Sequence, residues 1–133
     1  MPHLIVEYSA NLESRIDISD LVRRVHEASI ATGVFETATV RTRGERREHY
    51  AIADGHPDNA FVAVIVRIAT GRDAETRKRI GQAIFGAVCN YLERIYETMP
   101  IGISLEVQDM DTVEFRKNNM ASFMKKRGAK VSE

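Results

Sequence analysis

Apolar and polar residues are spaced along the chain in a way that predicts four main strands and two long helices. Short apolar runs rich in β-branched residues, bounded by polar or turn-forming residues, are typical of strands. The expected strands cover residues 4–6, 37–43, 61–68 and 101–107. A further short edge strand is expected at 49–53, because the turn-forming pair Asp54-Gly55 follows it.

Two longer stretches carry apolar residues every three to four positions, which is the period of an amphipathic helix. The first begins after Asp17, a residue that can cap a helix, and runs to about Thr32. Gly33 follows it, where glycine takes the left-handed conformation at low cost. The second begins after Asp73 and runs to about Glu97, before a proline that stops it.

The order of these elements predicts a duplicated α+β fold. Strand–helix–strand occurs twice, which gives a four-stranded mixed sheet with both helices on one face. We expect one domain over residues 1–124, with a solvated loop at 44–48 and a short helix around 120–124, then a basic tail at 125–133. Strand 61–68 is apolar on both faces, so we expect a homo-oligomer that covers the open face of the sheet.

Composition narrows the class of protein. The chain has 133 residues, 44% of them apolar, and its 19 Lys and Arg balance 19 Asp and Glu. A neutral chain lacks the positive charge that a dedicated nucleic-acid binder needs. The single cysteine, Cys89, cannot form an intramolecular disulfide, which favours an intracellular protein without a structural metal. The longest apolar run, 60–66, is far shorter than the roughly 20 residues of a membrane span. We expect a cytoplasmic protein with neither a membrane nor a nucleic-acid partner.

Familiar catalytic motifs are missing from the sequence. It contains no P-loop, no Rossmann glycine fingerprint, no H-E-x-x-H and no G-x-S-x-G. Its four histidines, His3, His26, His49 and His56, lack the spacing of metal ligands. The chemistry, if there is any, has to come from other residues.

Pro2 is the first candidate. A small residue at position 2 normally leads to removal of Met1, which would place a prolyl secondary amine directly before a strand. Burial beside cations lowers the pKa of an amine, and an amine that titrates near the working pH is a good general base. If Met1 stays, the Pro2 nitrogen is an amide without basicity. The alternative is that Pro2 only protects the N-terminus.

Arginine placement is the second feature. Arg41 and Arg43 are two residues apart in an expected strand and therefore project from the same face. Arg72 follows strand 61–68 where a helix begins, and such strand ends are favoured anion sites. Arginine binds carboxylates through two parallel hydrogen bonds. The alternative is that each arginine forms a surface ion pair with a neighbouring acidic residue.

An ordered set of segments resembles a known family. Residues 1–9 are similar to the start of the 5-carboxymethyl-2-hydroxymuconate isomerases, which belong to the tautomerase superfamily. Further segments match that family's landmarks at its spacing: 31–35 (ATGVF), 40–43 (VRTR), 53–55 (ADG), 60–62 (AFV), Gly71-Arg72 with Glu75 and Arg77, and Phe115 with Asn118-Asn119. The resemblance covers nearly the whole chain.

The resemblance implies a function and a mechanism. It implies a cofactor-free homotrimer that moves a proton on an unsaturated 2-hydroxy polycarboxylate during homoprotocatechuate breakdown. By resemblance the base is Pro2, and the arginines that bind the small polycarboxylate substrate are Arg41 and Arg72. Whether Arg43 replaces or assists Arg41, and which subunit supplies each arginine, stays open.

Two other functions remain possible at this level. The chain could be a decarboxylase or hydrolytic dehalogenase of the same superfamily, which needs a water-activating carboxylate near Pro2. It could also be a binding module that keeps the fold and has lost turnover. An RNA- or DNA-binding domain is disfavoured, because strand 61–68 has no pair of exposed aromatic residues on one face.

Overall fold

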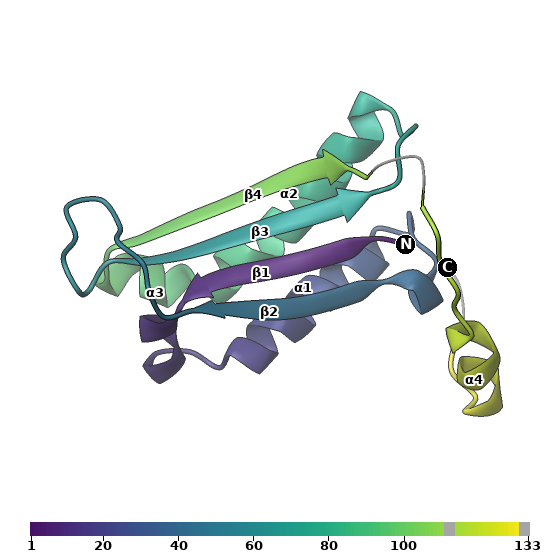
Figure 1. Ribbon diagram of the computed structural model, residues 1–133, viewed down its shortest axis with the longest axis horizontal. Coiled ribbons are helices and arrows are strands. Elements are labelled where there is room, and N and C mark those ends of the chain that lie inside the picture. The colour runs from purple at the N-terminus through teal and green to yellow at the C-terminus, as the bar shows by residue number, and fades with distance from the viewer. Residues whose placement is uncertain (111–113, 131–133) are drawn as a thin grey trace.

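The sheet has four strands in the order β2-β1-β3-β4, in a computed structural model that describes residues 1–110 and 114–130. The strands are β1 (His3–Ser9), β2 (Arg41–Arg47), β3 (Ala60–Ile68) and β4 (Ile101–Asp109). The outer pairs β1–β2 and β3–β4 are parallel, whereas the central pair β1–β3 is antiparallel. The sheet is therefore mixed, and the expected duplicated α+β fold is confirmed (Figure 1).

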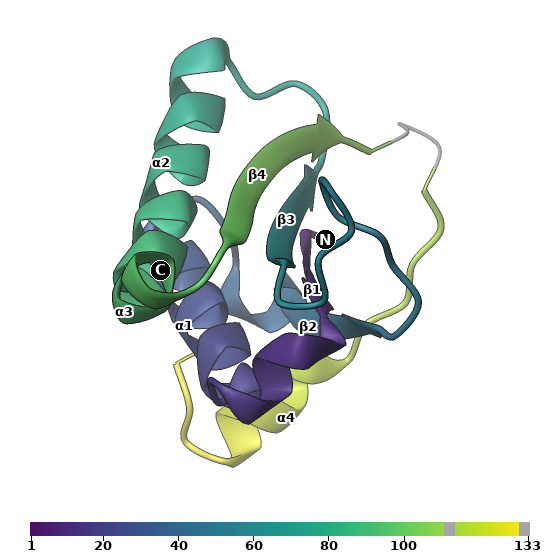
Figure 2. The same ribbon diagram turned by 90° about the vertical axis from the view of Figure 1, so that its left-hand side faces the viewer.

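The helices that follow β1 and β3 cover one face of this sheet. They are α1 (Ile18–Ala31) and α2 (Ala74–Tyr91), and Figure 2 shows both on the same side. Each begins where the sequence predicts. The side chain of Asp17 accepts a hydrogen bond from the backbone N–H of Asp20 (3.2 Å), and that of Asp73 from the backbone N–H of Thr76 (2.8 Å). Shorter helices are η1 (Ala10–Ser14), η2 (Thr37–Thr39), α3 (Glu93–Thr98) and α4 (Met120–Lys126).

The second long helix differs from its prediction at Leu92. The backbone there has φ −93° and ψ 10°, so the predicted single helix divides into α2 and α3. The backbone N–H of Leu92 donates to the carbonyl of Val88, and the backbone N–H of Tyr96 donates to the carbonyl of Leu92. Helical hydrogen bonds therefore continue on both sides of this position. Leu92 and Ile95 are both buried.

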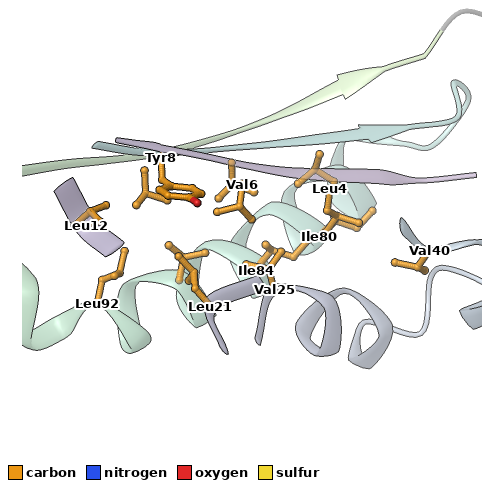
Figure 3. Close-up of a cluster of buried hydrophobic side chains, with 14 of the residues drawn as sticks. Leu4, Val6, Tyr8, Leu12, Leu21, Val25, Val40, Ile80, Ile84 and Leu92 are labelled. Atoms are coloured by element: carbon orange, nitrogen blue, oxygen red, sulfur yellow. The ribbon is translucent and has the colours of Figure 1, made fainter. Parts of the chain in front are cut away.

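The core lies between the sheet and the two long helices. Alternate residues of β1, namely Leu4, Val6 and Tyr8, point toward the helices, where Figure 3 shows them above Ile84 and its neighbours. Three valines of β3 align with them in the antiparallel register: Val66, Val64 and Val62. None of the helices in the described residues covers the other face, so the strands are held by what they bury on this one.

The prediction for β2 was wrong in its bounds. Residues 37–39 form a short 3-10 helix, and the strand covers Arg41–Arg47, including charged residues that we expected in a loop. Parallel pairing with β1 sets this register, and an edge strand with an open face tolerates charge. Arg47 pairs there with Glu7 (2.7 Å) and Glu45 (2.6 Å).

The short edge strand predicted at 49–53 was also wrong. These residues form a loop that crosses to the start of β3. Its shape is fixed by other contacts: the Asn59 side chain donates to the carbonyl of Ile52 (2.9 Å), and the Tyr50 ring packs edge-on against Phe61 with centroids 6.5 Å apart. Residues 10–14, expected as loop, form the 3-10 helix η1.

Two further features bear on the expected limits of the domain. α4 extends to Lys126, so the helix continues two residues past the boundary that we expected at 124. In the described part of the chain, no helix is both long enough and apolar enough to cross a membrane.

Ile84 offers a direct test of the core. It is fully buried on α2 between the sheet and α1, so Ile84→Ala should lower the free energy of unfolding by about 2–5 kcal/mol. Urea unfolding, measured at one protein concentration, gives this value. Gln82→Ala, at an exposed position of the same helix, is the control and should change it by less than about 0.5 kcal/mol. Equal values for both variants would contradict this description of the core.

Candidate active site

The candidate site lies where β1 and β2 begin and β3 ends. Pro2 is buried immediately before β1, and its carbonyl accepts a hydrogen bond from the backbone N–H of Arg41 (3.2 Å). Parallel pairing places the starts of β1 and β2 side by side, and antiparallel pairing brings the end of β3 to the same edge (Figure 1). The sheet therefore holds Pro2, Arg41 and the segment leading to Arg72 at one end of the molecule.

Arg41 and Arg72 both act on the start of the chain. The Arg41 Nη1 lies 3.1 Å from the Met1 sulfur. Arg72 donates to the carbonyl of Ala69 (3.3 Å), and its guanidinium lies over the ring of the buried Phe35, 5.3 Å from the centroid. A cation held against an aromatic face keeps a fixed position. Arg41 therefore contacts the start of the chain directly, whereas Arg72 is held at Ala69 and Phe35 and affects the N-terminal amine through its charge.

The pKa of the N-terminal amine depends on the burial and the charges at this site. Burial lowers the pKa of the Met1 amine, and the positive charges of Arg116, Arg72 and Arg41 lower it further, whereas the Glu114 carboxylate opposes them. An amine at this position is therefore more easily kept neutral than an ordinary one. Glu114 and Arg116 come from the segment that precedes α4, and no local sequence pattern indicates that either lies here.

Arg43 lies on the same face as Arg41, as predicted, but contacts a different group. Its Nη1 donates to Nδ1 of His3 at 3.2 Å. A guanidinium has no acceptor, so this Nδ1 carries no proton. Burial lowers the pKa of His3, and Arg43, Arg41 and Arg67 lower it further. His3 is consequently a neutral imidazole with its proton on Nε2.

Arginines of β2 divide into two groups. At the far end from Pro2, Arg46 pairs with Glu13 (2.8 Å) and Glu48, and Arg47 pairs with Glu7 and Glu45. Near Pro2, Arg41 and Arg43 have no carboxylate within 4.0 Å among residues 1–110 and 114–130. Surface ion pairing, which we weighed for every arginine, therefore describes the first group only.

A cavity of about 460 Å³ opens beside the start of the chain. Its wall includes His3 from β1, Arg67 from β3, and Phe115 with Arg116 from the segment before α4. Phe115 is 92% exposed. Arg67 and Arg116 were not among the candidate residues predicted from the sequence, although Arg67 carried a signal: it is the one charged residue of the strand predicted at 61–68.

Asn118 connects that segment to η2. Its side-chain amide donates to the carbonyl of Ala38 (3.1 Å), and its side-chain oxygen accepts from the backbone N–H of Met120 (2.7 Å). The same amide nitrogen lies 3.9 Å from the Met1 sulfur. No group of three His, Cys, Asp or Glu side chains in the described ranges is arranged to hold a metal ion.

Comparison with known proteins identifies the family. The model of the 5-carboxymethyl-2-hydroxymuconate isomerase family matches residues 2–124. A 5-carboxymethyl-2-hydroxymuconate Δ-isomerase of Escherichia coli is 31% identical over 126 residues, which cover 94% of this chain and all of that protein. The chain belongs to the 5-carboxymethyl-2-hydroxymuconate isomerase family. The resemblance drawn from the sequence is confirmed, and with it an isomerase of the tautomerase superfamily.

Solved structures agree with this assignment. A 5-carboxymethyl-2-hydroxymuconate isomerase from Deinococcus radiodurans superposes with a TM-score of 0.82 at 30% identity over 90% of both chains. A structure of a 5-carboxymethyl-2-hydroxymuconate δ-isomerase has a TM-score of 0.87 at 24% identity over 93% of both chains. More distant likenesses, such as a native fused 4-OT at 16% identity and a TM-score of 0.66, show the shared fold alone.

Proposed function

We propose that this protein isomerises 5-carboxymethyl-2-hydroxymuconate in homoprotocatechuate breakdown, without a cofactor and with Pro2 as the general acid and base. The observation that carries this proposal is a chain start where Arg41 lies against Met1 and where burial and the charges of Arg41 and Arg72 lower the pKa of the amine. Removal of Met1 would free the Pro2 nitrogen there. It would also vacate the position of the Met1 sulfur between Arg41 and Asn118.

The proposed reaction moves one proton. The neutral Pro2 amine takes the proton of the enol hydroxyl, so that the O–H bond breaks and a carbonyl forms. The resulting prolinium returns the proton to a carbon of the conjugated chain, which gives the conjugated ketone with no net loss or gain of atoms. Arg41 and Arg72 bind carboxylates and stabilise the negative charge that develops between the two transfers.

We further propose that the protein is a homotrimer. The support is the sheet face opposite the helices, which no element covers and which carries Ile5 and Ile65 beside charged residues. A distant fused 4-OT, 19% identical with a TM-score of 0.57, is described as a symmetric trimer. Light scattering on the purified protein should give three times the mass of one chain.

An intact mass and an absorbance assay together test the proposed function. We expect the mass of the chain without Met1, and a change in the absorbance of 5-carboxymethyl-2-hydroxymuconate as the dienol becomes the ketone. Loss of Met1 without turnover of this compound would overturn the proposed substrate. Retention of Met1 without turnover would favour a binding module, because an amide nitrogen cannot act as the base.

Glu114 favours a second candidate reaction. A hydrolytic reaction in this superfamily needs a carboxylate that activates water, and Glu114 acts on the N-terminal amine from the wall of the cavity. A structure from the cis-3-chloroacrylic acid dehalogenase family, 14% identical, shares the fold (TM-score 0.59). Chloride release from a 3-chloroacrylic acid, abolished by Glu114→Gln, would support this candidate over the isomerase.

A further inference from the structure

The proposed substrate has more carboxylates than Arg41 and Arg72 account for. A muconate has a carboxylate at each end, and the carboxymethyl substituent adds a third. A carboxylate taken from water into a site without a cation or hydrogen-bond donor is costly. A site selective for the tricarboxylate therefore needs a third cationic position.

The cavity at the start of the chain contains cationic residues that could provide this third position. Among the described residues of its wall, Arg67, Arg116 and Lys117 face one carboxylate, that of Glu114. Such an excess of cations in a concave place attracts an anion even though the whole chain is neutral. The cavity lies next to Met1, so a ligand that reaches Pro2 can extend into it.

Arg67 is the best-anchored of these cations. Its backbone is paired with His3 of β1 on one side and with Gln108 of β4 on the other. Arg116, by contrast, lies in a segment without regular secondary structure. Within the described ranges, no carboxylate lies within 4.0 Å of Arg67. The backbone of Arg67 is therefore held in place by two strands, and among the described residues its guanidinium is available to a ligand.

His3 adds a neutral donor beside Arg67. The two residues face each other across β1 and β3 and line the same cavity. Because Nδ1 of His3 accepts from Arg43, the ring presents an N–H at Nε2. A guanidinium and an imidazole N–H side by side can both donate to one carboxylate.

We propose that Arg67, with His3 beside it, binds the carboxymethyl carboxylate and makes the enzyme selective for the tricarboxylate. This inference rests on the proposed function. Arg41 and Arg72 would bind the two carboxylates of the muconate chain, and Arg67 the third. Arg67 thereby contributes to the choice of substrate rather than to proton transfer.

Two substrates and one variant test the proposal. In protein that has lost Met1, Arg67→Met should raise KM for 5-carboxymethyl-2-hydroxymuconate about 10–100-fold and leave kcat within about threefold. For 2-hydroxymuconate, which lacks the carboxymethyl group, KM should stay within about twofold. Arg67→Lys, which keeps the charge, should have a KM for 5-carboxymethyl-2-hydroxymuconate between those of the unsubstituted protein and Arg67→Met. Arg94→Met, on exposed α3 at the other end of the molecule, is the matched control and should change neither KM.

The outcomes separate this inference from the proposed function. Equal effects of Arg67→Met on both substrates, or no effect on either, would overturn the assignment of Arg67. Calorimetry with two unreactive probes, propane-1,2,3-tricarboxylate and glutarate, gives a second readout. The unsubstituted protein should bind the tricarboxylate about tenfold more tightly, and Arg67→Met should abolish this preference. A protein without turnover that still shows the preference would refute the isomerase and retain the subsite, whereas absence of the preference would refute the subsite.

Discussion

Pro2→Ala should lower kcat/KM for 5-carboxymethyl-2-hydroxymuconate by about 100–10,000-fold, the range that a positioned general acid and base contributes. Alanine at the chain start still offers an amine, but a primary one on a freely rotating bond. The buried pyrrolidine ring of Pro2 fixes its nitrogen against the sheet, next to the carbonyl that accepts from Arg41. Initial rates across a range of substrate concentrations measure the effect.

A second proline provides the control for this variant. Pro57 lies in the exposed loop before β3, so Pro57→Ala changes the same residue type away from the site and should leave kcat/KM within about twofold. Intact masses must show that Met1 is absent from all proteins compared, since a retained Met1 would by itself remove the basic nitrogen. Undiminished turnover in Pro2→Ala would exclude the proline mechanism.

Burial on the helix-covered face explains which parts of the fold the sequence predicts. Val62, Val64 and Val66 of β3 and Leu4 and Val6 of β1 are buried there and belong to continuous apolar runs, so both strands are recognisable without tertiary information. β2 is different because Arg41 to Arg47 contains no apolar residue. Its register comes from β1, and only Arg46 and Arg47 at its far end pair with carboxylates; a local pattern records neither fact.

The same distinction applies to the site. Pro2 precedes a predicted strand and Arg72 follows one, whereas Arg41 was predicted within a strand on the same face as Arg43; the resemblance gives all three their roles. His3 and Arg67 meet only through the antiparallel register of β1 and β3. Arg116 reaches the chain start from a segment more than a hundred residues away. A local pattern does not encode contacts over such distances.

Removing either of the two arginines that we propose to bind the substrate should have the second largest effect on activity. Arg72→Ala or Arg41→Ala should lower kcat/KM by about 100–1,000-fold, because each loses a charge-assisted contact that stabilises the developing enolate. Each should also move the acid limb of the pH profile. In the proposed mechanism the neutral amine is the active form, so activity is lost as pH falls through the pKa of that amine. Removing a cation that lowers the pKa of the amine raises that pKa, so the acid limb should shift to higher pH.

Lysine substitutions separate the two roles of each arginine. Arg72→Lys keeps the positive charge and loses the two-pronged geometry, so KM should rise while the acid limb stays within about 0.3 pH unit of its original position. Arg94→Ala, which removes a charge far from the N-terminus, should change neither quantity. An acid limb that stays in place in both Arg41→Ala and Arg72→Ala would mean that the titrating base is not the amine at the chain start. The lowered amine pKa would then be a consequence of the fold without a part in catalysis.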